Sequence, residues 1–200
     1  MKQKIFPLLL ALLLVSPLFG EVKWSQKTEK TEDKAYATQG QAFLSAPPDV
    51  IWQEVTKYDE LGEWMTKGLD QPENWTQPTY IQQIIGYPDL PAAEIIYGIK
   101  LFGFIDKENL SVVFAIQEDA ALKKLRLELT RSYSFVDEAF YEIALIPYAT
   151  GTRIDFQLQT KLPSFPRALM PKGIYVKNVV YFIERFLLNL EERSIDSLNN

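Results

Sequence analysis

The chain has 200 residues, of which 47% are hydrophobic, and it carries a formal net charge of −5 at pH 7. It contains neither histidine nor cysteine, which removes the commonest general base, the commonest transition-metal ligands, thiol nucleophiles and disulfides. Most hydrolase chemistries are therefore disfavoured, although paired carboxylates or a desolvated lysine would still permit acid–base catalysis.

The first twenty residues have the layout of a secretory signal peptide. Lys2 and Lys4 precede an apolar run, Ile5 to Val15, and the sequence turns polar after Gly20. The run is much shorter than the roughly 20 residues that a membrane-spanning helix needs. We therefore predict that residues 1–20 are removed on export, to the periplasm if the source is Gram-negative and otherwise to the medium. An uncleaved membrane anchor is the alternative.

Residues 1–20 hold two lysines and no acids, so their removal takes the net charge to −7. An acidic surface of this kind disfavours nucleic acid and anionic membranes as partners. It does not disfavour a lipid held in an interior cavity, where apolar contact supplies the affinity. The length that remains suits one domain, which we expect to be a monomer.

Residues 21–34 are polar, and we interpret them mostly as a lead-in in which Val22 and Trp24 can form one short strand. The ligand-binding domain is then expected to span residues 35–200. It starts with a strand over 35–44.

Pro47 and Pro48 end this first strand, because proline lacks the amide donor of a sheet ladder, and Pro48 suits the first turn of a helix. Apolar residues then follow at helical spacing up to Val55. Asp59 is a candidate N-cap for a second short helix, ELGEWM. Residues 66–80 are rich in turn formers and predict a loop that contains Trp75.

The next part of the chain predicts antiparallel strands. The candidates are residues 80–87, 93–104, 110–118, 122–131, 138–148 and 152–162. Alternation is clearest where Leu125, Leu127, Leu129 and Arg131 share one face, which is typical of a half-buried strand. A long amphipathic helix over residues 174–198 ends the chain. The sum is an α+β fold with helices on one face of a sheet.

Three segments together resemble the START-like, Bet v 1-related superfamily, also called SRPBCC, which includes polyketide cyclase-like and lipid-transfer proteins. They are FLSAPPDVIWQEVTKYDELGEWM, FYEIALIPYATGTRIDFQLQTKL and LPSFPRALMPKGIYVKNVV, and the likeness spans residues 36–195. The resemblance implies a helix-grip fold, in which a curved antiparallel sheet wraps a long C-terminal helix around a hydrophobic cavity. One departure is Lys107-Glu108, which stands where many lipid-binding members have an Arg-Asp pair.

Aromatic residues at alternate positions of the predicted strands, with two on the helix, are candidates to line such a cavity. The candidates are Tyr97, Phe114, Tyr141, Phe156, Phe182 and Phe186. The plainer alternative is that they are ordinary core. Trp52 and Trp64 either pack the short helices onto the sheet or cover the cavity mouth, and we favour packing.

Arg131 is the seventh candidate, because alternation aims its guanidinium inward, where a charge requires a partner or a ligand head group. The alternative is that the strand ends before Arg131 and leaves it exposed. Glu138, Glu142 and Asp155 are interpreted as a solvated outer face, and no loop has the acid spacing of a calcium site, so we expect neither metal nor cofactor.

Three functions follow from these observations. The first is an exported carrier or sensor that binds an apolar small molecule, such as a lipid. The second is a cyclase- or hydrolase-like enzyme with Arg131 or an acid as the acid–base group beside Tyr97 or Tyr141. The third is a protein-interaction module whose cavity has collapsed.

Overall fold

The computed structural model describes residues 22–69, 79–101 and 105–199. The expected signal peptide and Trp75 lie outside these ranges. In chain order the elements are β1 (Lys23–Lys30), β2 (Tyr36–Leu44), α1 (Pro48–Val55), η1 (Tyr58–Glu60), α2 (Leu61–Met65), β3 (Thr79–Tyr87), β4 (Ala92–Leu101), β5 (Ile105–Asp119), β6 (Lys124–Tyr133), β7 (Glu138–Tyr148), β8 (Gly151–Lys161), α3 (Ser164–Leu169) and α4 (Lys172–Asn199). None of the helices described is long and apolar enough to span a membrane.

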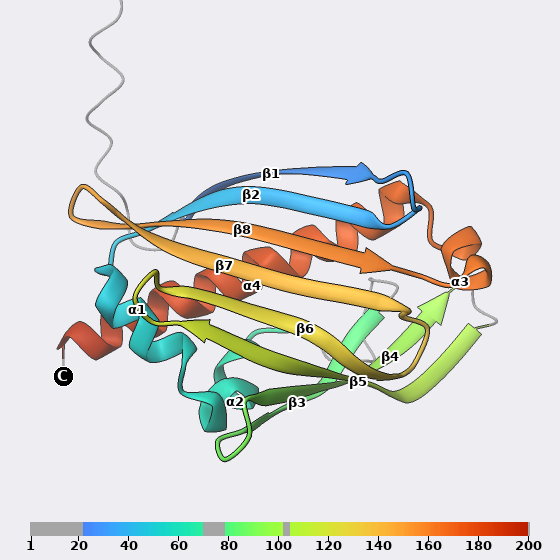
Figure 1. Ribbon diagram of the computed structural model, residues 1–200, viewed down its shortest axis with the longest axis horizontal. Helices are drawn as coiled ribbons and strands as arrows, with labels where there is room; N and C mark the ends of the chain where they lie inside the picture. Colours follow the sequence, from blue (N-terminus) through green and yellow to red (C-terminus); the bar gives the residue numbers. More distant parts are fainter. Residues whose placement is uncertain (1–21, 70–78, 102–104, 200) are drawn as a thin grey trace, which may run out of the picture.

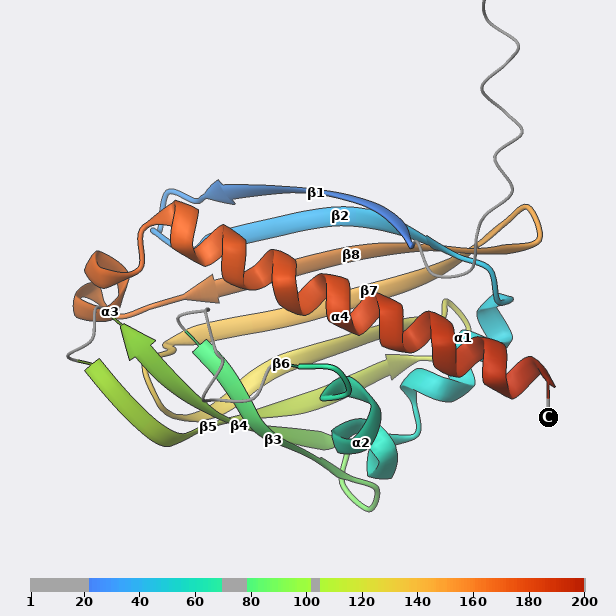
Figure 2. The same ribbon diagram turned by 180° about the vertical axis from the view of Figure 1, so that it is seen from behind.

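The eight strands form one antiparallel sheet in the order β1-β2-β8-β7-β6-β5-β4-β3. The sheet curls, and the 28-residue helix α4 runs across its concave face (Figures 1 and 2). Helices α1 and α2 lie at one end of the sheet and α3 lies at the other (Figure 1). The expected α+β helix-grip fold is therefore confirmed.

Helix α4 is tied to both halves of the sheet. The ring of Tyr175 stacks on Tyr36 of β2, with ring centroids 4.3 Å apart. Three residues further on, Asn178 Nδ2 donates to Thr79 Oγ1 of β3 at 2.5 Å. Because β2 and β3 lie near opposite edges of the sheet, α4 closes the curled sheet over its interior.

Strand β1 differs from the predicted lead-in. All eight of its residues pair with β2, and Thr28 and Thr38 share a hydrogen bond of 2.9 Å between their hydroxyls. Trp24 packs against the core, whereas Lys23, Ser25 and Lys27 are exposed. An edge strand with one solvated face needs few apolar residues, so the hydrophobic pattern that predicted the other strands is weak here.

The predicted cap at Asp59 is also wrong. Residues Tyr58–Glu60 form a 3₁₀ turn that leads directly into α2, and no side chain caps either element. The first helix is as expected, with Pro48 in its first turn.

The end of the sheet near α1 and α2 is closely packed. Ile51, Val55, Leu187 and Leu190 are each at most 2% exposed. Trp64 is 4% exposed, and its ring lies 5.5 Å from that of Phe186. The packing role expected for Trp64 is confirmed.

Gly86 is where β3 passes closest to the short helices. A Cβ at this position would lie 1.7 Å from the carbonyl oxygen of Tyr58. We expect Gly86→Ala to lower the free energy of unfolding by about 1–3 kcal/mol, because the backbone must move to relieve the clash. Gly173→Ala is the control, since its Cβ would meet nothing within 4 Å, and it should stabilise the protein by about 0.5 kcal/mol. Urea denaturation measures both; equal stabilities would contradict the predicted contact.

Candidate functional site

The interior between the concave face and α4 retains accessible apolar surface. Leu127, Leu129, Ile143 and Leu158 occupy inward positions of β6, β7 and β8, yet each is only half-buried. The backbone of α4 comes closest to α1, α2 and β2 rather than to these central strands. Protein interiors are normally close-packed. Accessible inward-facing aliphatic side chains are therefore the feature expected of an internal binding site for an apolar molecule.

Three of the predicted aromatic residues meet in this interior. Phe114 of β5 is buried, and its ring lies 5.1 Å from that of Tyr141 on β7. Tyr97 of β4 packs against the same cluster, which also contains Val112 and Ala139.

The other predicted aromatics lie apart from these three. Phe156 belongs to the larger core cluster, with its ring 6.5 Å from that of Trp24. Phe186 packs against Trp64 near the α2 end, and Phe182 forms an edge-to-face contact with Tyr181. The aromatics therefore span the interior rather than forming one compact site, and ligand contact by each of them stays a prediction.

The inward orientation expected for Arg131 is wrong. Arg131 is exposed, as in the alternative, but β6 does not end before it and continues to Tyr133. Leu129 pairs with Phe114, and Arg131 pairs with Val113. Two consecutive residues of β5 therefore pair with two residues of β6 that have one extra residue between them. This β-bulge inserts Thr130, whose hydroxyl donates to the Val113 carbonyl at 3.1 Å. Alternation shifts by one residue, and Arg131 emerges exposed on the outer face beside the ring of Tyr133. Arg131, one of the acid–base groups considered for an enzyme, is thus not in the interior.

Sequence reasoning missed a group of uncharged polar side chains at the α3 end of the interior. This group, called the polar pole below, consists of Thr38, Tyr141, Thr160, Tyr175 and Asn178. The Tyr175 hydroxyl donates to Thr160 Oγ1 at 3.3 Å, and Tyr141 interacts with the same hydroxyl. One signal was present, because Thr38 and Thr160 stand at inward positions of strands whose other inward residues are mostly apolar.

Burial raises the pKa of Tyr141, and the neighbouring Tyr175 raises it further. The pKa of Tyr97 and that of Tyr175 are also raised, chiefly by burial. These hydroxyls are therefore neutral at physiological pH and act as hydrogen-bond donors and acceptors, not as charged groups.

The raised tyrosine pKa values predict alkaline sensitivity. A group whose pKa is higher in the folded state contributes full stability below its unfolded pKa, near 10, and loses that contribution as the pH rises. We expect the free energy of unfolding to fall steeply above about pH 10. Urea denaturation between pH 8 and 11 measures this effect, and Tyr141→Phe should reduce the slope. Identical slopes for wild type and variant would contradict the assignment.

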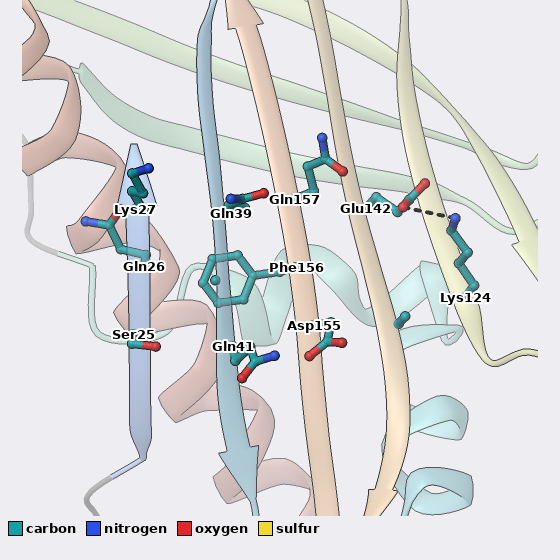
Figure 3. Close-up of a pocket in the computed structure, with 12 residues that line it drawn as sticks. Ser25, Gln26, Lys27, Gln39, Gln41, Lys124, Glu142, Asp155, Phe156 and Gln157 are labelled. Carbon is teal, nitrogen blue, oxygen red and sulfur yellow. Dashed lines mark ion pairs between the residues drawn. The ribbon is translucent and has the colours of Figure 1, made fainter. Parts of the chain in front are cut away.

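The outer face carries a second candidate site, a hollow of about 560 Å³ (Figure 3). Its lining residues are Ser25, Gln26, Lys27, Gln39, Gly40, Gln41, Lys124, Glu142, Ala144, Asp155, Phe156 and Gln157. Most of them are polar, and the acids already have partners. Glu142 pairs with Lys124 at 3.0 Å and with Arg126 at 3.3 Å, and Asp155 lies 2.9 Å from Arg153. This hollow offers little to an apolar ligand.

The predicted solvated carboxylates do lie on the outer face. Glu138 is exposed and pairs with Lys161 at 2.6 Å, as Glu142 pairs with its neighbours. Lys107 and Glu108 are exposed as well, and Glu108 accepts a hydrogen bond from the Tyr80 hydroxyl. Within the described ranges, no three acids gather in a way that would hold a metal ion.

Comparison with known proteins supports the fold and goes no further. No family model matches the chain, and no curated protein sequence matches it. Among solved structures, the TTHA0849 protein from Thermus thermophilus is 16% identical with a TM-score of 0.55, covering 80% of this chain and 97% of that one. A START superfamily protein from Mycobacterium smegmatis is 13% identical, with a TM-score of 0.51 and coverage of 86% and 97%.

The Zhui aromatase/cyclase from Streptomyces sp. R1128 is also similar, at 10% identity and a TM-score of 0.52, with 86% of this chain and 94% of that one covered. At these identities the likeness concerns the fold alone. The chain therefore has the START-like fold that its sequence motifs indicated.

Proposed function

We propose that this protein binds a hydrophobic small molecule of lipid type between its concave sheet and α4, and carries or senses that molecule without converting it. The observation that carries the proposal is the accessible apolar surface on the inward faces of β6, β7 and β8. Burying such surface is worth about 25 cal/mol per Å² to an apolar ligand. A ligand that fills the interior would supply the apolar contacts that the protein itself does not make there.

The fold alone does not separate binding from catalysis, because an aromatase/cyclase is among the structural neighbours. The residues favour binding. Arg131 lies on the outer face, and the polar pole consists of neutral hydroxyl and amide groups. An interior of this composition supplies contact surface and hydrogen bonds, whereas acid–base catalysis needs a group that gains or loses a proton near neutral pH.

Export is the second part of the proposal, and it rests on residues 1–20. Two lysines followed by a short apolar run are typical of a cleaved signal peptide. Intact-mass measurement after expression in a secreting host tests this. A mature chain that starts near Glu21 supports export, and a full-length product retained with the membrane fraction supports the anchor instead.

Native mass spectrometry tests the binding function. Protein purified under mild conditions from its natural source should show a population heavier than the bare chain by the mass of one small molecule. Denaturation should release that mass, and solvent extraction should recover a compound of low polarity. Repeated recovery of a bare chain that also takes up no added lipid would overturn the proposal.

A further inference from the structure

The polar pole differs from the rest of the interior in what it can bind. Its members come from four separate elements: Thr38 from β2, Tyr141 from β7, Thr160 from β8, and Tyr175 and Asn178 from α4. The neighbouring hydroxyl of Tyr36 is already committed, since it donates to the Met170 carbonyl at 2.8 Å. Tyr175 is also held in place by its stacking on Tyr36.

Asn178 contributes an unused hydrogen-bond acceptor. Its side chain is only 9% exposed, and its Nδ2 donates to Thr79 Oγ1. Its Oδ1 is buried without a hydrogen-bond partner in the part of the chain that the structure describes. Leaving a buried acceptor without a hydrogen bond is unfavourable. The atom is covered by protein, so a ligand hydroxyl can donate to it only after a shift of the Asn178 side chain, and that hydrogen bond would then offset the unfavourable burial.

The strands that face the pole present no charge to the interior. The inward residues of β7 are Ala139, Tyr141, Ile143 and Leu145, while Glu138 and Glu142 point outward. The charge of Arg167 on α3 acts on the neighbouring Tyr36, but its guanidinium already donates to the Leu162 carbonyl and the Ser164 hydroxyl. An anionic head group buried at the pole would lose its hydration without gaining a counter-charge.

We propose that the polar pole receives the hydroxyl group of an uncharged, otherwise apolar ligand, so that the preferred cargo is a lipid alcohol and not a fatty acid or phospholipid. A hydroxyl can donate to Asn178 Oδ1 and accept from a tyrosine hydroxyl. A carboxylate or phosphate oxygen can do only the second. The inference rests on the proposed function, because it requires that the interior bind an apolar molecule.

Displacement of the neutral fluorescent probe N-phenyl-1-naphthylamine at pH 8 tests the inference. The competitors are 1-dodecanol, dodecanoate and dodecane, which share one chain length and differ at one end. We expect 1-dodecanol to displace the probe at a concentration at least ten-fold lower than dodecanoate does, because only dodecanoate must bury a charge. Dodecane should fall between the two.

Variants locate the discriminating groups. Tyr141→Phe and Asn178→Leu should each weaken 1-dodecanol about five-fold more than they weaken dodecane, because only 1-dodecanol loses a hydrogen bond. Tyr148→Phe is the matched control, since Tyr148 is exposed, and it should change nothing. Probe binding with equal displacement by dodecanoate and 1-dodecanol would overturn this inference alone. Failure of the probe and of all three competitors to bind would overturn the proposed function and the inference with it.

Discussion

Replacing Glu54 by alanine should lower the free energy of unfolding by about 3–5 kcal/mol, the largest stability effect that we expect of a single carboxylate among the described residues. The Glu54 side chain is 2% exposed at the interface of α1 and α4. Its oxygens accept from Lys57 Nζ and from the Ser197 hydroxyl, both at 2.7 Å, and from Arg193 Nε. Removal of Glu54 leaves a partly buried guanidinium whose other partner among the described residues is Glu60.

The control is an ion pair of the same geometry that lies in solvent. Lys67 and Glu192 are also 2.7 Å apart and also join α4 to the short-helix region, but their side chains are 59% and 53% exposed. We expect Glu192→Ala to change the free energy of unfolding by less than about 0.5 kcal/mol. Urea denaturation of both variants measures the contrast. Equal effects would show that burial does not set the strength of the Glu54 cluster.

The same cluster predicts a loss of stability in acid. Burial alone would raise the pKa of Glu54, but the hydrogen bonds from Lys57, Ser197 and Arg193 outweigh it and hold the pKa below its ordinary value of 4.5. A lowered pKa gives stability that is present above 4.5 and is lost as the pH falls through the folded value. The stability difference between wild type and Glu54→Ala should therefore shrink on acidification from pH 7 to pH 3.

Replacing Leu127 by tryptophan should weaken binding of N-phenyl-1-naphthylamine at least ten-fold. Leu127 lies on the inward face of β6, is half-buried, and packs against the larger core cluster and the smaller cluster of Phe114. A larger ring at this position would occupy the space that the ligand is proposed to use. Overpacking a filled core typically costs about 1–3 kcal/mol, so a stability loss below about 1 kcal/mol would itself indicate available space.

Glu128→Trp is the matched control for this substitution. Glu128 is the next residue of the same strand and is exposed on the outer face. The control should leave the probe affinity unchanged. Full probe binding in Leu127→Trp, or weakened binding in Glu128→Trp, would place the probe outside the interior.

The faces of β6 and β8 were predictable because their alternation is strong. In β8, Ile154 and Phe156 are buried while Gln157 is exposed, as a period of two requires. The orientation of Arg131 was not predictable in the same way. One extra residue at the bulge moves every later side chain of the strand to the opposite face of the sheet. Bulges depend on the pairing of two strands, which a single strand's pattern does not contain.

The polar pole could be predicted only in part. Thr38 and Thr160 occupy inward positions that alternation identifies, but their proximity to Tyr175 depends on where α4 crosses the sheet. That crossing is fixed by contacts between residues far apart in the chain, such as the stacking of Tyr36 on Tyr175. The aromatic residues Tyr97, Phe114 and Tyr141 do lie in one cluster, although register shifts occur next to Tyr97 and next to Phe114. Whether they contact a ligand or are ordinary core stays a prediction.

The most direct test of the central claim is to locate a bound ligand. Crystals of the protein grown with 12-bromo-1-dodecanol should give a bromine anomalous peak between the concave face of the sheet and α4, with the chain running along Leu127 and Ile143. The hydroxyl should lie at the polar pole, near Tyr141 and Asn178. A bromine peak confined to the outer hollow beside Gln39 and Gln157, or no peak in crystals that contain the compound, would contradict the account.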